Sequence, residues 1–66
     1  MNYLICFVNE NGEDWCIVCG DDYDYMYNLF EKMSPPPGWN MELRETAEDI
    51  DTYMDYTVIR YDHSNF

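Results

Sequence analysis

Residues 3–19, with the sequence YLICFVNENGEDWCIVC, contain two apolar runs that are separated by Asn11-Gly12. An Asn-Gly pair between two runs of β-forming residues is a strong hairpin signal, because both central positions of a type I′ turn require positive φ. The sequence therefore predicts an antiparallel hairpin, with one strand over residues 3–8 and its partner over residues 13–19.

The register of this hairpin determines which side chains share a face. With a two-residue loop, Val8 pairs with Trp15 and Cys6 pairs with Ile17. One face then carries Leu4, Cys6, Val8, Trp15, Ile17 and Cys19, and the other carries Tyr3, Ile5, Phe7, Asp14, Cys16 and Val18. Both faces are largely apolar, which is typical of a central hairpin or of one that packs against a second subunit.

A helix is expected after the hairpin. Gly20 interrupts the second strand, and Asp21 or Asp22 can cap a helix that runs to about Met33. Apolar residues recur at helical spacing within it, namely Tyr23, Met26, Phe30 and Met33. The segment Ser34-Pro35-Pro36-Pro37-Gly38 ends the helix, because proline cannot continue it.

The remaining residues predict two further strands. Residues 39–46 alternate apolar and polar side chains, and residues 56–61 are rich in β-forming residues. Residues 47–55 are compatible with a short helix or with an acidic loop, and residues 62–66 are expected to fray. The element order is ββαβ(α)β, so we expect an α+β fold in which one main helix packs on a small antiparallel sheet. Residues 1–66 are expected to form a single compact acidic domain.

The charge of the chain is its most unusual property. Fourteen Asp and Glu residues face three Lys and Arg residues, which gives a formal net charge of −11. A hydrophobic content of 47% and an aromatic content of 18% distinguish this chain from an acidic disordered tail. Solubility of a small domain requires a net charge of only about 2–8 in magnitude, and excess charge destabilises a compact fold. We therefore expect the acidic surface to have a function.

The cysteines offer a second hypothesis. Cys16-Ile17-Val18-Cys19 is a CxxC motif, but redox CxxC motifs open a helix, where the thiol pKa is lowered. In a regular strand the two sulfurs point to opposite faces, so we interpret these cysteines as small hydrophobic residues. An odd cysteine count without a signal peptide favours reduced thiols. The alternative is a small metal-binding protein that uses Cys6, Cys16, Cys19 and His63.

Other chemistry is poorly represented. His63 is the only histidine, no Gly-rich phosphate loop is present, and Asp49, Asp51 and Asp55 lack the glycine of a calcium-binding EF-hand loop. We therefore expect no enzymatic activity, no catalytic residue, no cofactor and no bound metal. No apolar run approaches the roughly 20 residues that span a bilayer, so we expect a cytoplasmic protein without membrane contact.

The acidic residues suggest mimicry of nucleic acid. Carboxylates on neighbouring helical turns or on alternate strand positions lie about 5–7 Å apart, close to the phosphate spacing along one DNA strand. We predict that the partner is a basic DNA- or RNA-binding protein and that the chain does not bind nucleic acid itself. The residues expected to replace phosphates, which we call the predicted acidic set, are Asp21, Asp22, Asp24, Glu45, Glu48, Asp49, Asp51 and Asp55. Tyr25 and Tyr53 are candidates for cation–π contacts with the partner.

In size, charge and aromatic content, the chain resembles the small acidic proteins that phages produce to inhibit DNA-binding proteins of the host or of its defence systems. That class includes DNA-mimic inhibitors of restriction enzymes, CRISPR nucleases, uracil-DNA glycosylase and nucleoid-associated proteins. The resemblance covers overall character and not a motif. It implies DNA mimicry in the host cytoplasm and transfers no residue roles.

Another hypothesis from the sequence is an acidic protein–protein interaction module that regulates RNA polymerase or another complex outside its DNA site. Competition distinguishes it from a DNA mimic, because duplex DNA displaces only the mimic. Homodimer formation is compatible with both hypotheses, since small domains often gain stability by oligomerisation.

Overall fold

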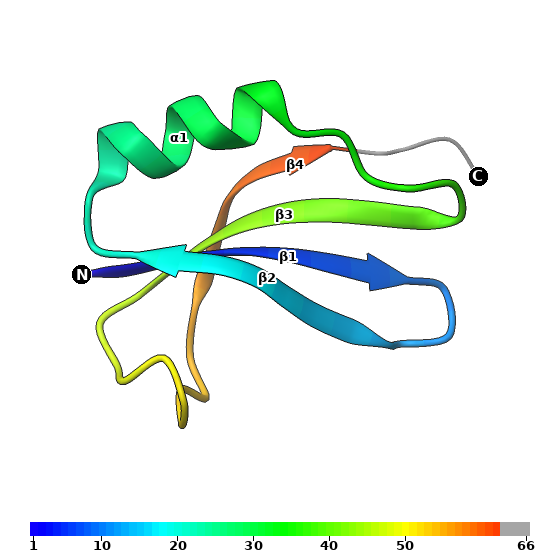
Figure 1. Ribbon diagram of the computed structural model, residues 1–66. Coiled ribbons are helices and arrows are strands. Elements are labelled where there is room, and N and C mark those ends of the chain that lie inside the picture. The colour runs from blue at the N-terminus through cyan, green and yellow to red at the C-terminus, as the bar shows by residue number, and fades with distance from the viewer. Residues whose placement is uncertain (63–66) are drawn as a thin grey trace.

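Four strands and one helix make up residues 1–62, the part of the chain that the computed structural model describes (Figure 1). The elements are β1 (Asn2–Asn9), β2 (Asp14–Gly20), α1 (Tyr23–Lys32), β3 (Trp39–Thr46) and β4 (Thr57–Asp62). The strands form one sheet in the order β2-β1-β3-β4, and all neighbouring strands are antiparallel. The expected α+β fold, with one helix on a small antiparallel sheet, is confirmed.

Local signals in the sequence locate the helix well. The Asp22 carboxylate caps α1 by accepting a hydrogen bond from the Tyr25 backbone N–H, at 3.2 Å. Met33 ends the helix in an extended conformation immediately before the proline-rich segment. Residues 47–55 contain turns and no helix, so the acidic loop is the correct alternative. Of the tail, Asp62 belongs to β4, and residues 63–66 lie outside the described residues.

The hairpin loop differs from the prediction. Gly12 has a φ of 80°, but Asn11 has no positive φ, so the type I′ turn does not form. Instead, the Gly12 N–H donates to the carbonyl oxygen of Asn9 at 3.1 Å, as in a three-residue loop with a left-handed glycine. The side-chain oxygen of Asn9 accepts hydrogen bonds from the backbone N–H groups of Asn11 and Glu13, at 3.1 and 2.9 Å. These bonds favour the longer loop.

The longer loop shifts the register near the turn. Val8 pairs with Asp14 rather than with Trp15, so the predicted pairing is wrong there. The pairing is irregular between Ile5 and Cys6 of β1, where β2 has one extra residue. From Ile5 towards the start of β1, the pairing again follows the predicted register.

The longer loop and the β-bulge together change the predicted faces of residues 14–16, which lie between the turn and the bulge. Cys16 lies opposite Cys6, and Cys19 lies opposite Leu4, so all three cysteines belong to the same face of the sheet. The expectation that Cys16 and Cys19 point to opposite faces is wrong, because the bulge interrupts the alternation. Trp15 moves to the opposite face, where it lies across from Phe7.

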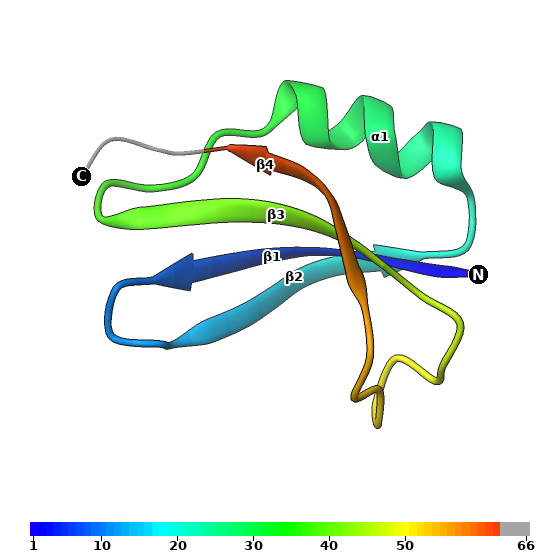
Figure 2. The same ribbon diagram turned by 180° about the vertical axis from the view of Figure 1, so that it is seen from behind.

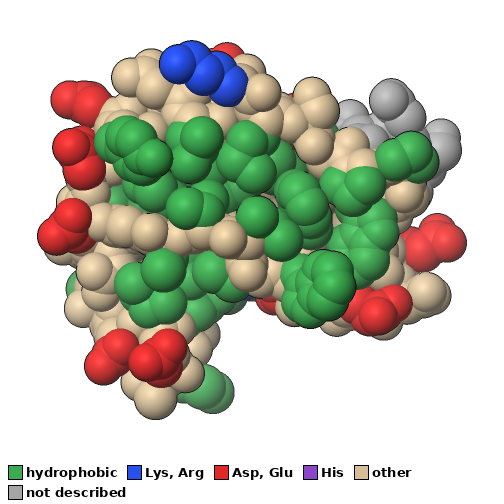
Figure 3. All heavy atoms as spheres, in the orientation of Figure 1, with side chains coloured by type: hydrophobic (Ala, Val, Ile, Leu, Met, Phe, Trp, Pro, Cys, Tyr) green, Lys and Arg blue, Asp and Glu red, His purple; other side chains and the backbone are tan. Residues whose placement is uncertain are grey.

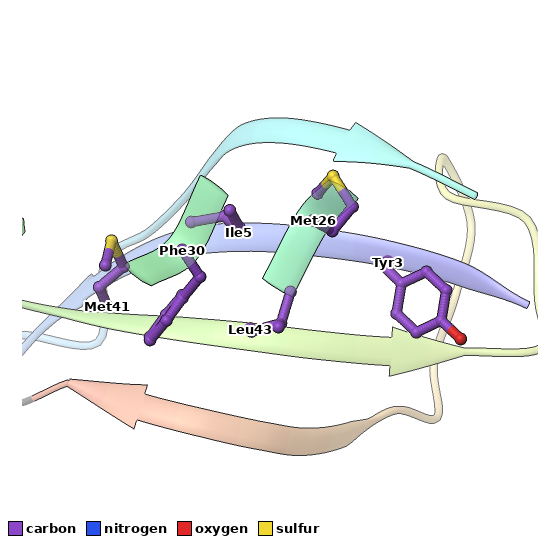
Figure 4. Close-up of a cluster of buried hydrophobic side chains, with 6 residues drawn as sticks. All are labelled: Tyr3, Ile5, Met26, Phe30, Met41 and Leu43. Atoms are coloured by element: carbon purple, nitrogen blue, oxygen red, sulfur yellow. The ribbon is translucent and has the colours of Figure 1, made fainter. Parts of the chain in front are cut away.

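The hydrophobic core lies between α1 and one face of the sheet. Met26 and Phe30 are the buried residues of the helix, and they pack on side chains of the two central strands. Figure 4 shows the cluster, which consists of Tyr3, Ile5, Met26, Phe30, Met41 and Leu43. Within the described residues, no helix packs on the opposite face of the sheet (Figure 2). The buried side chains of that face are therefore shielded from solvent by contacts other than helix packing.

Substitution of Met26 by alanine tests this core. Met26 is 0% exposed, whereas Met54 is 83% exposed. We expect Met26→Ala to lower the free energy of unfolding by about 2–5 kcal/mol, because it leaves a cavity. Met54→Ala is the matched control, with an expected change below about 0.5 kcal/mol. Urea unfolding followed by circular dichroism measures both, and equal losses would contradict the assignment of the core.

Candidate partner-binding surface

Arg44 organises the face of the sheet that lies opposite α1. Its side chain is 3% exposed, and its guanidinium forms ion pairs with Asp14 and Glu42, both at 2.8 Å. It also donates a hydrogen bond to the hydroxyl of Tyr53 at 2.9 Å and stacks over the ring of Tyr56 at 4.4 Å. Burial alone lowers the pKa of Arg44, but these hydrogen bonds raise it overall, so the residue stays charged. Arg44 therefore connects β2, β3 and the 47–56 loop.

Arg60 plays a comparable role on the helix side. Its guanidinium forms an ion pair with Glu31 at 2.7 Å and a hydrogen bond with the hydroxyl of Tyr27. It also lies over the rings of Tyr27 and Phe30, at 4.8 and 5.7 Å. Of the three basic residues in the chain, only Lys32 forms no ion pair with a described residue.

The topology brings the predicted acidic set to one end of the sheet. Tyr3 pairs with Gly20 on one side and with Glu45 on the other. Residues 21–24 and the 47–56 loop therefore leave the sheet at the same end. Figure 3 shows acidic side chains along the corresponding edge, from the start of α1 to the 47–56 loop.

Ion pairs between described residues do not neutralise the predicted acidic set. The ion-paired carboxylates are Asp14, Glu31 and Glu42, and none of them belongs to the set. Within residues 1–62, no member of the set forms an ion pair. Six members are exposed, and Glu45 and Glu48 are half-buried. This end of the molecule is therefore a surface of uncompensated carboxylates.

Hydrogen bonds hold the 47–56 loop in place. The hydroxyl of Thr46 donates to the carbonyl oxygen of Asp55 at 2.7 Å, and the side-chain amide of Asn2 donates to the carbonyl oxygen of Glu48 at 2.8 Å. The Glu48 carboxylate accepts from the backbone N–H groups of Met54 and Asp55, at 3.2 and 2.9 Å. Glu48 therefore fixes the loop in addition to contributing charge.

The two predicted tyrosines differ in their availability. Tyr25 is 62% exposed in the first turn of α1, next to Asp24. Tyr53 is half-buried, and its hydroxyl accepts the hydrogen bond from Arg44. Its ring packs edge-on against the ring of Tyr56, with the two centroids 5.6 Å apart. Only Tyr25 is therefore free to contact a partner.

The cysteines are unpaired thiols. Cys6 is buried, whereas Cys16 and Cys19 are exposed. Burial raises the pKa of Cys6 to about 12, and it also raises the pKa of Cys16. Within the described residues no group of His, Cys, Asp and Glu side chains has the arrangement of a metal site, and His63 lies outside this range.

Sequence reasoning missed two features of this molecule. One is the role of Arg44. The chain has only three basic residues, and the position of one of them on a predicted strand could have indicated this role. The other is a stacked pair of tryptophans, Trp15 and Trp39, which the predicted hairpin register separates. The three-residue loop brings Trp15 to the face of Trp39, and the Asn-Gly signal does not indicate that loop.

Comparison of the chain with protein-family models, with curated proteins and with solved structures finds no match in any of the three. None of the helices in the described part is long and apolar enough to cross a membrane.

Replacement of Arg44 tests its role. We expect Arg44→Met to lower the free energy of unfolding by about 3 kcal/mol, because it leaves Asp14 and Glu42 without their buried partner. Arg60→Met is the matched control, with an expected loss of about 1 kcal/mol, because Arg60 is 37% exposed. Equal losses in urea unfolding would contradict the central role of Arg44.

Thiol reactivity tests the placement of the cysteines. Because the pKa of Cys6 is raised to about 12, its thiolate fraction at pH 8 is on the order of 10⁻⁴. We expect Ellman's reagent to modify Cys16 and Cys19 in the folded protein and Cys6 only after unfolding. Mass spectrometry of the modified peptides identifies each site, and rapid modification of Cys6 in the folded protein would contradict its burial.

Proposed function

We propose that the chain is a non-enzymatic, acidic DNA-mimic inhibitor of the kind that phages produce. It binds the basic nucleic-acid-binding surface of a host or defence protein, in the host cytoplasm. The observation that carries this proposal is the predicted acidic set, which lies at one end of the sheet without ion pairs to described residues.

The mechanism that we infer is electrostatic. A basic groove that binds DNA gains affinity largely from phosphate neutralisation and the release of counterions. Carboxylates on a fixed surface bring negative charge to the same groove. The N-terminal turn of α1 and the hydrogen-bonded 47–56 loop supply that surface, and Tyr25 adds an exposed ring for contact with arginine or lysine.

The experiment is capture of bacterial proteins on the immobilised chain. We expect the chain to retain a DNA-binding protein and duplex DNA to release it in a concentration-dependent manner. Retention of a protein that duplex DNA does not release would contradict mimicry. That outcome would favour an acidic module that binds RNA polymerase or another complex outside its DNA site.

A pair of double variants tests the surface itself. Asp24→Asn with Asp51→Asn removes two exposed charges of the predicted acidic set. We expect this variant to bind the captured protein roughly a hundredfold more weakly, because each of the two close charge pairs contributes about 1.5 kcal/mol or more. The control, Glu10→Gln with Asp62→Asn, removes the same charge outside the set. Equal weakening by both variants would indicate a non-specific effect of net charge and contradict the assigned surface.

A further inference from the structure

A cavity of about 350 Å³ lies at the hairpin end of the sheet, away from the predicted acidic set. Its lining residues are Glu13, Asp14, Trp15 and Trp39. The two indole rings are stacked, with centroids 6.3 Å apart and an interplanar angle of 15°. These are the only tryptophans of the chain, so both of them line one cavity.

The fold exposes Trp15 and leaves Trp39 half-buried. Trp15 lies opposite Phe7 and Trp39 lies opposite Asn9, so both tryptophans belong to the face of the sheet that carries α1. Nevertheless, Trp15 is 68% exposed. Figure 3 shows hydrophobic side chains from α1 to the hairpin end, where acidic side chains lie next to them. An exposed tryptophan beside acidic groups is typical of a binding surface rather than of a core.

The charge of the cavity comes mainly from Glu13. Asp14 also lines the cavity, but its carboxylate forms the ion pair with Arg44 at 2.8 Å. Glu13 forms no ion pair within residues 1–62. Its carboxylate accepts a hydrogen bond from the side-chain amide of Asn9 at 2.9 Å, which holds it in position. The cavity therefore combines indole faces with a fixed and uncompensated negative charge.

We propose that this cavity binds the guanidinium group of an arginine side chain from a partner protein. Indole faces attract cations, and a planar guanidinium stacks on them better than an ammonium group does. The Glu13 carboxylate supplies an acceptor for the guanidinium N–H groups. The inference goes beyond the proposed function, because it concerns a separate surface and requires no mimicry of nucleic acid.

Binding of a short peptide tests the proposal directly. The probe is the capped tripeptide Gly-Arg-Gly, and its matched control has citrulline, a neutral analogue of arginine, in the central position. We expect the arginine peptide to change the tryptophan fluorescence and both indole N–H resonances of the full chain in a saturable manner. We expect affinity for the citrulline peptide to be at least roughly tenfold lower, since it has no charge.

Variants of the chain locate the site. Glu13→Gln keeps the acceptor for Asn9 and removes the charge, so we expect a roughly 3–10-fold loss of affinity for the arginine peptide. In Trp15→Leu, we expect the arginine peptide to cause no change in the fluorescence or in the indole N–H resonance of Trp39. Glu10→Gln removes a charge from the same hairpin outside the cavity and should change the affinity less than about twofold.

Several outcomes would overturn the proposal. Equal affinity for the arginine and citrulline peptides would show that the cavity does not recognise the charge of the guanidinium. Equal losses of affinity in Glu13→Gln and Glu10→Gln would indicate attraction by net charge alone. The absence of a saturable change at the indole resonances would also overturn it. The peptide assay does not involve the predicted acidic set, so its failure and the failure of DNA mimicry are distinguishable.

Discussion

The buried guanidinium of Arg44 is the interaction on which the rest of the structure depends. Burying a charge is costly unless its partners are close and well oriented, and Arg44 has two carboxylates, a phenolic hydroxyl and an aromatic ring around it. One of these partners, Asp14, reaches the correct face only because the hairpin has a three-residue loop. With the two-residue loop, Asp14 would belong to the face that carries α1. The hairpin register and the buried ion pair therefore stabilise each other.

The same interaction controls the distribution of charge on the surface. The chain has three basic residues, and Arg44 and Arg60 neutralise carboxylates on opposite sides of the sheet. The acidic end of the molecule receives no ion pair from either of them. Yet the 47–56 loop, which carries part of that acidic end, is attached to the sheet through the contacts of Tyr53 and Tyr56 with Arg44. A buried cation thus positions exposed anions, which explains how a chain with a net charge of −11 keeps its carboxylates on a fixed surface.

The sequence predicted those features that local physics determines. Apolar runs, one alternating segment and one segment rich in β-forming residues located the strands to within one residue, and Asp22 with the proline-rich segment located the helix. The hairpin register was wrong, because the side chain of Asn9 stabilises a turn that the Asn-Gly signal does not indicate. The composition predicted an acidic surface, but only the strand pairing brings residues 21–24 and 47–56 to one end. The role of Arg44 depends on partners from three segments, and no local pattern reveals such a contact.

The positions of the two proposed binding surfaces constrain the partner. The acidic end lies where α1 begins, and the tryptophan cavity lies at the hairpin, so they occupy opposite ends of β1. The longest extent of the molecule is 31 Å, a length similar to that of about nine base pairs of duplex DNA at 3.4 Å per step. A partner groove that contacts both surfaces therefore spans up to this length, with basic residues against the acidic end and an arginine at the cavity. A partner with a shorter groove can use only one of the two surfaces, and the acidic end then provides most of the charge while the cavity stays open to solvent.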